Sequence, residues 1–120
     1  MSEKIDNFKQ LKIWQMGIEI ARDVYVLTER FPKEEMYGLT SQVRRASVSI
    51  PSNVAEGFKR NHCKEFSQFI HVALGSAAEI ETQLIVSREV GYINTTDLKN
   101  ISNKLDQFSR MATSLLKKMH

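Results

Sequence analysis

Apolar residues recur at intervals of three and four along most of the chain, and this spacing constrains the fold more than any other feature of the sequence. Residues that are three or four positions apart lie on one face of an α-helix, whereas a half-buried strand requires strict alternation. The first segment with this spacing contains two neighbouring apolar rows: Leu11, Trp14, Ile18, Ala21, Tyr25 and Thr28, and Ile13, Gly17, Ile20, Val24, Leu27 and Phe31. Because a residue before a proline is displaced from helical geometry, we predict that this helix ends at Phe31-Pro32.

The second segment keeps the same spacing straight through a proline. Its core row is Leu39, Val43, Ala46, Ile50, Asn53 and Gly57, and two further rows also pass Pro51 without a change of phase. We therefore predict one helix, which begins near Glu34 and Glu35 and is kinked at Pro51, rather than two separate helices. A proline inside a helix costs about 3 kcal/mol and leaves one carbonyl, here that of Ser47, without its donor. We expect nearby serines or water to bond this carbonyl.

Two more helices complete the pattern. The third is predicted over residues 64–90, because Gly91 is a suitable C-terminal stop. The fourth begins after Thr95 or Thr96, which are preferred N-cap residues. Its apolar residues form an unbroken seam: Leu98, Ile101, Leu105, Phe108, Ala112, Leu115 and Met119. Four helices with short connections predict an all-α fold, an antiparallel up-down-up-down four-helix bundle that forms a single domain over residues 1–120. The low content of turn residues, 5 Gly and 2 Pro, agrees with this fold class.

The cysteine content and the apolar stretches bear on the compartment. Cys63 is the only cysteine, so no disulfide can form within the chain, which favours a reducing compartment. The N-terminal residues contain no apolar run of signal-peptide length. The longest uncharged stretch, residues 66–78, is too short and too polar to cross a bilayer. We therefore expect a cytoplasmic protein without a membrane segment.

No catalytic or metal-binding motif is recognisable in the sequence. The histidines His62, His71 and His120 show no ligand spacing with Cys63 or with carboxylates, and we expect His71 to be an interior or interface histidine. Neither a P-loop nor a dinucleotide-binding glycine fingerprint occurs. The acidic residues of the third helix do not converge as an acid–base pair. The sequence therefore predicts a protein that is not an enzyme and that uses no cofactor or metal.

Basic residues gather around the second helix, although the net charge is only +3. The candidates for contact with a nucleic acid or a partner are Arg44, Arg45, Lys59, Arg60 and Lys64. Two of them, Arg45 and Lys59, share the solvent-facing row of the helix, whereas Arg44 is a candidate for a buried network. Basic residues in such positions are also typical of solvated helix ends and faces.

Asn53 falls on the core row of the second helix, where a buried amide needs hydrogen-bond partners. We expect a polar network of Asn53, Glu56 and Glu79, completed by Arg44 or Arg45. Such a network either fixes the register of the bundle and the kink, or belongs to a surface that binds an RNA phosphate or a protein partner.

Two long stretches resemble a known family. They are "LKIWQMGIEIARDVYVLTERFPKEEMYGLTSQVRRASVSIPSNVAEGFKR" and "EFSQFIHVALGSAAEIETQL". They closely resemble the bacterial four-helix-bundle proteins encoded in intervening sequences of 23S rRNA genes, a family that is sometimes labelled as a ribosomal protein. The resemblance implies an antiparallel four-helix bundle that assembles into pentameric rings. The family is also similar to the accessory protein of diversity-generating retroelements, a basic pentamer that binds nucleic acid and a reverse transcriptase.

The apolar arcs of the first and third helices are wider than the core of one small bundle needs. Such arcs fit either a thick core with scattered exposed apolar residues or a homo-oligomer that buries the second faces. We predict a homo-oligomer, a pentamer, and on the first helix we assign the surplus to the row of Ile13, Ile20, Val24 and Leu27. The resulting hypothesis is a non-enzymatic homo-oligomeric helical protein that binds structured RNA or a nucleoprotein partner through basic surface groups. The alternative is an oligomeric scaffold or protein-interaction module without nucleic-acid affinity.

Most aromatic residues fall on core rows of the predicted helices. If the protein binds a nucleic acid, we therefore expect little base stacking and low sequence specificity.

Overall fold

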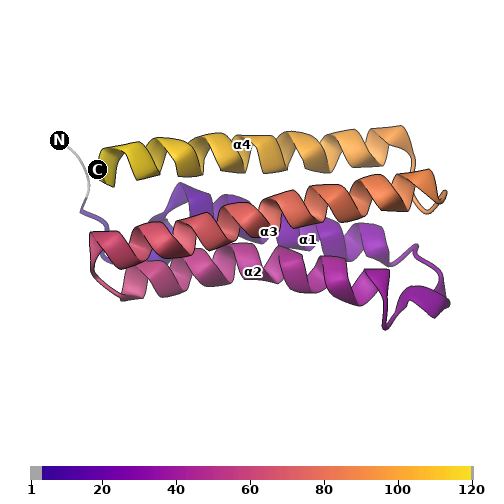
Figure 1. Cartoon of the computed structure of the whole chain (residues 1–120), viewed down its shortest axis with the longest axis horizontal. Coiled ribbons are helices and arrows are strands. Elements are labelled where there is room, and N and C mark those ends of the chain that lie inside the picture. The colour runs from indigo at the N-terminus through magenta and orange to yellow at the C-terminus, as the bar shows by residue number, and fades with distance from the viewer. Residues whose placement is uncertain (1–3, 120) are drawn as a thin grey trace.

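A computed structural model describes residues 4–119 as a bundle of four helices that measures 47 × 25 × 20 Å (Figure 1). The helices are α1 (Lys12–Thr28), α2 (Leu39–Lys59), α3 (Cys63–Glu89) and α4 (Thr95–Met119). Two short 3-10 turns, η1 (Phe8–Gln10) and η2 (Lys33–Glu35), precede α1 and α2. The turn η1 and the end of α4 lie at the same end of the bundle in Figure 1. Residues 4–119 contain no strand, so the predicted all-α, four-helix fold is confirmed.

All four long helices contribute to one core. Helix α2 packs against α1 and α3, and α4 packs against the other side of the same two helices. The fully buried large side chains are Phe108, Ile20, Ile50, Ile70, Ile80, Leu84, Val24, Val43 and Val54. The seam predicted for α4 is buried from Leu98 to Ala112, as expected for a helix that presents one apolar stripe.

The two apolar rows of α1 have the opposite roles to those assigned from the sequence. The row that we interpreted as surplus is the core row, because Ile13, Ile20, Val24 and Leu27 are all at most 5% exposed. The other row contributes the exposed Ile18 and Tyr25, whereas the still more exposed Val26 belongs to neither row. The two rows are only about 100° apart on a helix, so periodicity alone does not show which of them faces the core.

The connection between α1 and α2 differs from the prediction at both of its ends. Helix α1 ends at Thr28 rather than at Phe31-Pro32, because the N–H groups of residues 29–31 bond carbonyls three positions back and tighten the chain into a turn. Helix α2 begins at Leu39 rather than near Glu34 and Glu35. These two glutamates belong to the turn η2 instead.

Glu35 caps α2 from outside the helix. Its Oε1 accepts a hydrogen bond of 3.1 Å from the Leu39 N–H, and its Oε2 accepts one of 2.8 Å from the Tyr92 hydroxyl. These two donors, the backbone N–H first, hold the pKa of the Glu35 carboxyl below its ordinary value. The Tyr92 ring also packs 5.4 Å from the Phe31 ring, so the α3–α4 turn is fastened to the α1–α2 connection.

Helix α2 continues through Pro51, and the prediction of one helix is confirmed. The predicted kink stays a prediction. The serine and asparagine side chains around Pro51 bond carbonyls other than the one that it leaves free. The Ser47 hydroxyl donates to the Arg44 carbonyl at 2.7 Å, and Asn53 Nδ2 donates to the Ser49 carbonyl at 2.8 Å. Pro51 itself is buried beside Gly17 of α1, where an added Cβ would lie 3.2 Å from the proline ring.

The turn between α3 and α4 follows the prediction at its first end only. Gly91 has a φ of 86°, and the Gly91 and Tyr92 N–H groups bond the carbonyls of Arg88 and Ser87, which is the Schellman arrangement. The N-cap of α4 is Asn94 rather than Thr95 or Thr96. Its side-chain oxygen accepts a hydrogen bond of 2.8 Å from the Asp97 N–H, because an asparagine carbonyl reaches the open N–H groups of a first turn.

Charged groups hold α4 against α1. Lys104 of α4 lies half-buried between Glu19, at 2.8 Å, and Asp23. Its hydrogen bonds to Asp23 and Glu19 raise the pKa of the ammonium group. A second pair joins Arg30 to Asp97 at 3.0 Å. The side chains in these contacts keep between 21% and 57% of their surface exposed to solvent, so we assign the contacts to orientation rather than to a large share of stability.

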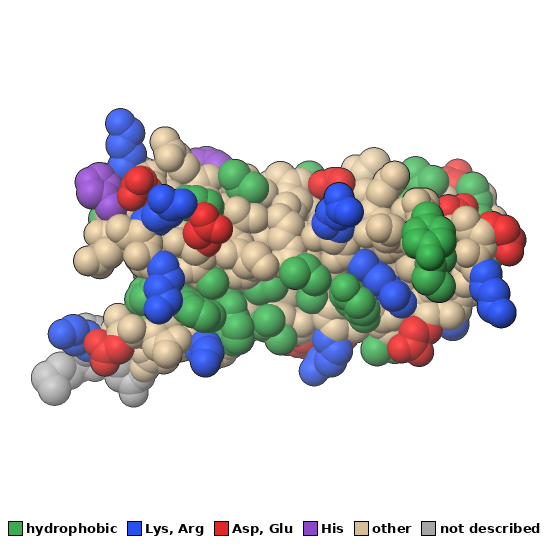
Figure 2. All heavy atoms as spheres, turned by 90° about the horizontal axis from the view of Figure 1, so that it is seen from below, with side chains coloured by type: hydrophobic (Ala, Val, Ile, Leu, Met, Phe, Trp, Pro, Cys, Tyr) green, Lys and Arg blue, Asp and Glu red, His purple; other side chains and the backbone are tan. Residues whose placement is uncertain are grey.

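Apolar side chains remain on the outside of the bundle. Helix α1 exposes Ile18 and Tyr25, and α2 exposes Val48; we call these three residues the α1–α2 apolar band. Helix α3 exposes Val72 and Val86. Figure 2 shows apolar side chains gathered in a band along one face, with basic side chains beside them. The excess apolar surface that the sequence predicts therefore exists, although on α1 it comes from Ile18 and Tyr25 of the other row and from Val26, which lies in neither row.

Among the described helices, α3 is long and apolar enough to cross a bilayer by length and composition. Its most apolar window has a mean hydropathy of 1.2, and 39% of that window is buried within the bundle. Core helices of soluble proteins pass the same test, so this is weak evidence for a membrane span. The predicted absence of a membrane segment stays a prediction.

Candidate nucleic-acid and partner interface

The outer face of α2 carries two basic side chains that make no ion pair within residues 4–119. Arg45 and Lys59 are both exposed, and they are about 21 Å apart along the helix, given a rise of 1.5 Å per residue. Lys64 is exposed at the start of α3 and likewise has no acidic partner in the described chain. Side chains of this kind are available to neutralise phosphates without breaking an existing contact.

Arg44 is turned inward and joins α2 to α1. Its Nε donates to the Thr28 hydroxyl at 2.8 Å, and one terminal nitrogen donates to the Tyr25 carbonyl at 3.4 Å. The guanidinium also lies 4.6 Å from the centre of the Tyr25 ring. A guanidinium with these three contacts serves the packing of two helices, so Arg44 is not free for a phosphate.

Arg60 is also occupied within the chain. One terminal nitrogen lies 3.0 Å from Glu56 Oε2, one helical turn earlier. The guanidinium is 5.1 Å from the centre of the Phe69 ring of α3. Of the five predicted basic residues, Arg45, Lys59 and Lys64 therefore have no charge partner among the described residues.

The polar network predicted for Asn53, Glu56 and Glu79 does not form in the described residues. Asn53 Nδ2 donates to the carbonyl and the hydroxyl of Ser49, both at 2.8 Å. The Ser49 hydroxyl in turn lies 2.8 Å from that of Ser76 on α3. The Asn53 Nδ2 group needs no carboxylate, because the carbonyl and hydroxyl of a serine one turn away already accept its hydrogen bonds. Glu56 pairs with Arg60, and Glu79 accepts a hydrogen bond of 3.2 Å from Gln83 Nε2.

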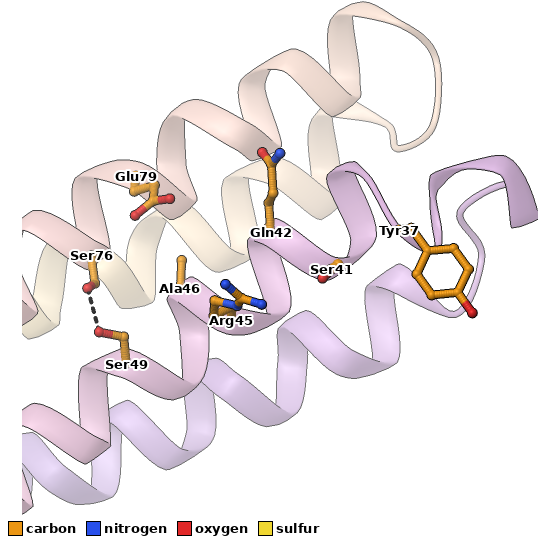
Figure 3. Close-up of a pocket in the computed structure, with 8 residues that line it drawn as sticks. All are labelled: Tyr37, Ser41, Gln42, Arg45, Ala46, Ser49, Ser76 and Glu79. Atoms are coloured by element: carbon orange, nitrogen blue, oxygen red, sulfur yellow. Dashed lines mark hydrogen bonds between the residues drawn. The ribbon is translucent and has the colours of Figure 1, made fainter.

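A polar groove lies between α2 and α3. Its volume is about 450 Å³, and its walls are Tyr37, Ser41, Gln42, Arg45, Ala46, Ser49, Ser76 and Glu79. In Figure 3 Gln42 projects from α2 toward α3, and Glu79 projects from α3 toward α2. The Ser49–Ser76 hydrogen bond crosses between the helices at one end, and Tyr37 stands at the other (Figure 3). The groove thus offers a cation, an anion and hydroxyl groups within one concave surface.

Tyr37 is the residue of this site that sequence reasoning missed. Its side chain is 98% exposed, and among the described residues it has no hydrogen-bond or ring partner. It precedes α2 in an irregular turn, where apolar periodicity gives no signal. Its place beside Gly38 marks a turn immediately before the basic helix, and it lies in the stretch that resembles the family, but neither signal indicates that its ring is exposed.

Residues 4–119 hold no cluster of three His, Cys, Asp or Glu side chains that would bind a metal ion. His62 and Cys63 are exposed neighbours at the start of α3. His71 is exposed on α3, so an interior position is excluded, and the predicted alternative of an interface position stays a prediction. His120, which was considered with them, lies outside the described residues.

Fold and site together define a small four-helix-bundle protein with a polar groove and unpaired basic side chains along its second helix. The chain belongs to the family of 23S rRNA-intervening sequence proteins, whose sequence pattern matches residues 9–114. The resemblance seen in the sequence is therefore confirmed for this family.

Solved structures share the fold. One of them is a protein of unknown function from the S23 ribosomal protein family of Bacteroides thetaiotaomicron, with a TM-score of 0.79 and 22% sequence identity. The match covers 88% of this chain and 95% of that one. At this identity the likeness shows the fold alone. No curated protein matches the chain.

Proposed function

We propose that this chain is a non-enzymatic, homo-oligomeric helical protein that binds structured RNA through basic side chains on the outer face of α2. The observation that supports RNA binding most directly is the pair Arg45 and Lys59. They share one exposed face, and neither has a charge partner in the described chain. Assembly would repeat this face once per subunit, and repeated weak phosphate contacts produce a large gain in avidity.

The proposal is tested by reversing both charges, Arg45→Glu together with Lys59→Glu. We expect RNA affinity at low salt to fall roughly tenfold or more, and the slope of log affinity against log salt to decrease by about one for each lost contact. Because both side chains are exposed and unpaired, the melting temperature and the oligomeric mass should not change. Fluorescence anisotropy with a labelled structured RNA across a salt series measures the effect.

A matched control keeps the same change of net charge. Lys12 of α1 and Lys99 of α4 are exposed and lie off α2, so Lys12→Glu with Lys99→Glu should retain most of the affinity. If the α2 double variant binds RNA as tightly as wild type does at low salt, the assignment of this surface is wrong.

Self-association is the second part of the proposal, and the α1–α2 apolar band supports it. Ile18, Tyr25 and Val48 are between 42% and 44% exposed in the single chain, and a subunit contact would bury them. We expect light scattering at micromolar concentration to give a mass near five times the 13.8 kDa of one chain. A monomer under these conditions would contradict the proposal.

An oligomeric scaffold or protein-interaction module without nucleic-acid affinity is the alternative. The same apolar band favours it, together with the acidic Glu56 and Glu79 close to the basic face. An oligomer of the expected mass that binds no RNA at low salt would decide for this alternative.

A further inference from the structure

Helices α1 and α3 expose apolar side chains on opposite sides of the bundle. The two helices lie at opposite corners, because α2 and α4 each pack against both of them (Figure 1). Ile18 and Val26 are exposed on α1, and Val72 and Val86 are exposed on α3. All four side chains keep between 44% and 61% of their surface accessible in the single chain. A contact on one side of the molecule therefore cannot bury both apolar surfaces.

The apolar surface of α1 has a cation at its centre. Arg22 lies one helical turn from Ile18 and one turn from Val26, and we call these three residues the α1 outer line. The Arg22 side chain is 67% exposed. Its ion pair with Asp23 is long, at 3.7 Å, and Asp23 is also bound by Lys104. The guanidinium is therefore available to another carboxylate.

The apolar surface of α3 has a carboxylate at its centre. Glu79 lies two turns from Val72 and two turns from Val86, and these three residues form the α3 outer line. The Glu79 side chain is exposed, and it accepts a hydrogen bond from the neutral amide of Gln83. The two outer lines thus have the same order of apolar and charged groups, with charges of opposite sign.

These central charges determine which surfaces can meet. A contact between two α1 outer lines would bring Arg22 near a second Arg22, and a contact between two α3 outer lines would bring Glu79 near a second Glu79. Like charges that are brought together in an interface are strongly unfavourable, whereas opposite charges favour the contact and fix its register. The surface of α1 therefore complements the surface of α3 better than it complements itself.

We propose that the α1 outer line of one copy of this chain binds the α3 outer line of the next copy, with Arg22 paired to Glu79 across the contact. This inference rests on the proposed self-association and specifies the two faces that it uses. Contacts between unlike faces form a closed ring when the rotation between copies allows it, whereas a single isologous contact joins only two chains. Every copy in such a ring turns α2, with Arg45 and Lys59, in the same direction relative to the ring axis.

The spacing of the side chains allows an apolar contact and the charge pair to form together. Arg22 is about 6 Å from Ile18 along α1, and Glu79 is about 10.5 Å from either valine along α3. When Ile18 packs on one valine, the two charged residues are offset by about 4.5 Å, which the long stem of the arginine spans. Gly75 lies between Val72 and Glu79 and projects no side chain, so a partner that rests on these two leaves room there for one methyl group.

The test exchanges the two charges. Arg22→Glu and Glu79→Arg, each alone, should raise the concentration of half-assembly roughly tenfold or more, because each places like charges in the contact. The double variant Arg22→Glu with Glu79→Arg should return close to the wild-type value. Sedimentation velocity over a dilution series measures this concentration. The rescue cannot arise within one chain, since α1 and α3 lie at opposite corners of the bundle.

Lys12→Glu and Glu81→Arg are the matched controls. Both residues are exposed on the same two helices but lie off the two outer lines, so these variants should assemble as wild type does. Val72→Glu provides a second test of the α3 surface and should also weaken assembly, because it places a charge in an apolar contact. Its side chain is 52% exposed, so the variant should fold, and the melting temperature checks this for every variant.

The outcomes separate this inference from the proposed function. If Val72→Glu or either single charge variant assembles as wild type does, or if the double variant assembles no better than the single ones, the two surfaces do not meet. The inference is then wrong, while the proposed self-association stands. If wild type itself is a monomer, the inference and the proposed self-association fail together.

Discussion

Phe108→Ala is expected to lower the free energy of unfolding by about 3–5 kcal/mol. Phe108 is the largest fully buried side chain, with no exposed surface, and it lies in the middle of the α4 seam. Truncation removes its apolar surface from the core and leaves a cavity, because helices α1 and α3 on either side of α4 relax only in part. For a domain of this size the loss is a large fraction of the total stability.

Urea unfolding followed by circular dichroism measures this loss. Gln107→Ala is the control, since Gln107 is the exposed neighbour of Phe108 and its change should stay within about 0.5 kcal/mol. If Phe108→Ala lowers the free energy of unfolding no more than the control does, then α4 does not bury Phe108 in the core as the structure shows.

The helices were predictable because each one must bury a continuous apolar stripe. Apolar residues three and four positions apart in the sequence form such a stripe on a helix. The α4 seam and the passage of α2 through Pro51 both follow from it. The spacing did not show which of the two apolar rows of α1 faces the core. Ile20 is fully buried and Ile18 is 44% exposed, although both are isoleucines in an apolar row. Only the tertiary position of α2 and α4 decides which row faces the core.

Helix ends were less predictable than helix bodies, because several residue types compete to cap a helix. Gly91 was identified correctly, since a positive φ favours glycine over all other residues. Asn94 and Thr95 are both acceptable caps, and the sequence offers no reason to choose between them. Glu35 caps α2 across the turn that follows η2, which no rule of local spacing anticipates.

The basic positions of the candidate site were predictable, but their partners were not. The row that contains Arg45 and Lys59 is exposed as its polarity indicated. The adjacent Arg44 is held by Thr28 and Tyr25 of another helix, a contact that depends on how α1 and α2 pack. Tyr37 belongs to an irregular turn, so its exposure is a tertiary property and required the structure.

Two glycines provide a second test of the packing, because the same substitution should have opposite effects at the two sites. Gly57 is buried where α2 meets α3, and an added Cβ would lie 2.7 Å from the Phe69 Cβ and 3.0 Å from the Phe66 ring. The Phe69 Cβ is attached to the α3 backbone, so the two helices would have to separate. Overpacking of this kind costs about 1–3 kcal/mol, against a gain of at most about 1 kcal/mol from the better helix propensity of alanine.

We therefore expect Gly57→Ala to lower the free energy of unfolding by about 1–2 kcal/mol. Gly75→Ala should raise it by about 0.5–1 kcal/mol, since Gly75 is exposed within α3 and no atom lies within 4 Å of the added Cβ. Urea unfolding of both variants at one protein concentration measures the difference. A gain for Gly57→Ala would contradict the close approach of α2 and α3. A loss for Gly75→Ala would show that another chain covers this face of α3, since nothing in the described chain lies close enough to resist one methyl group.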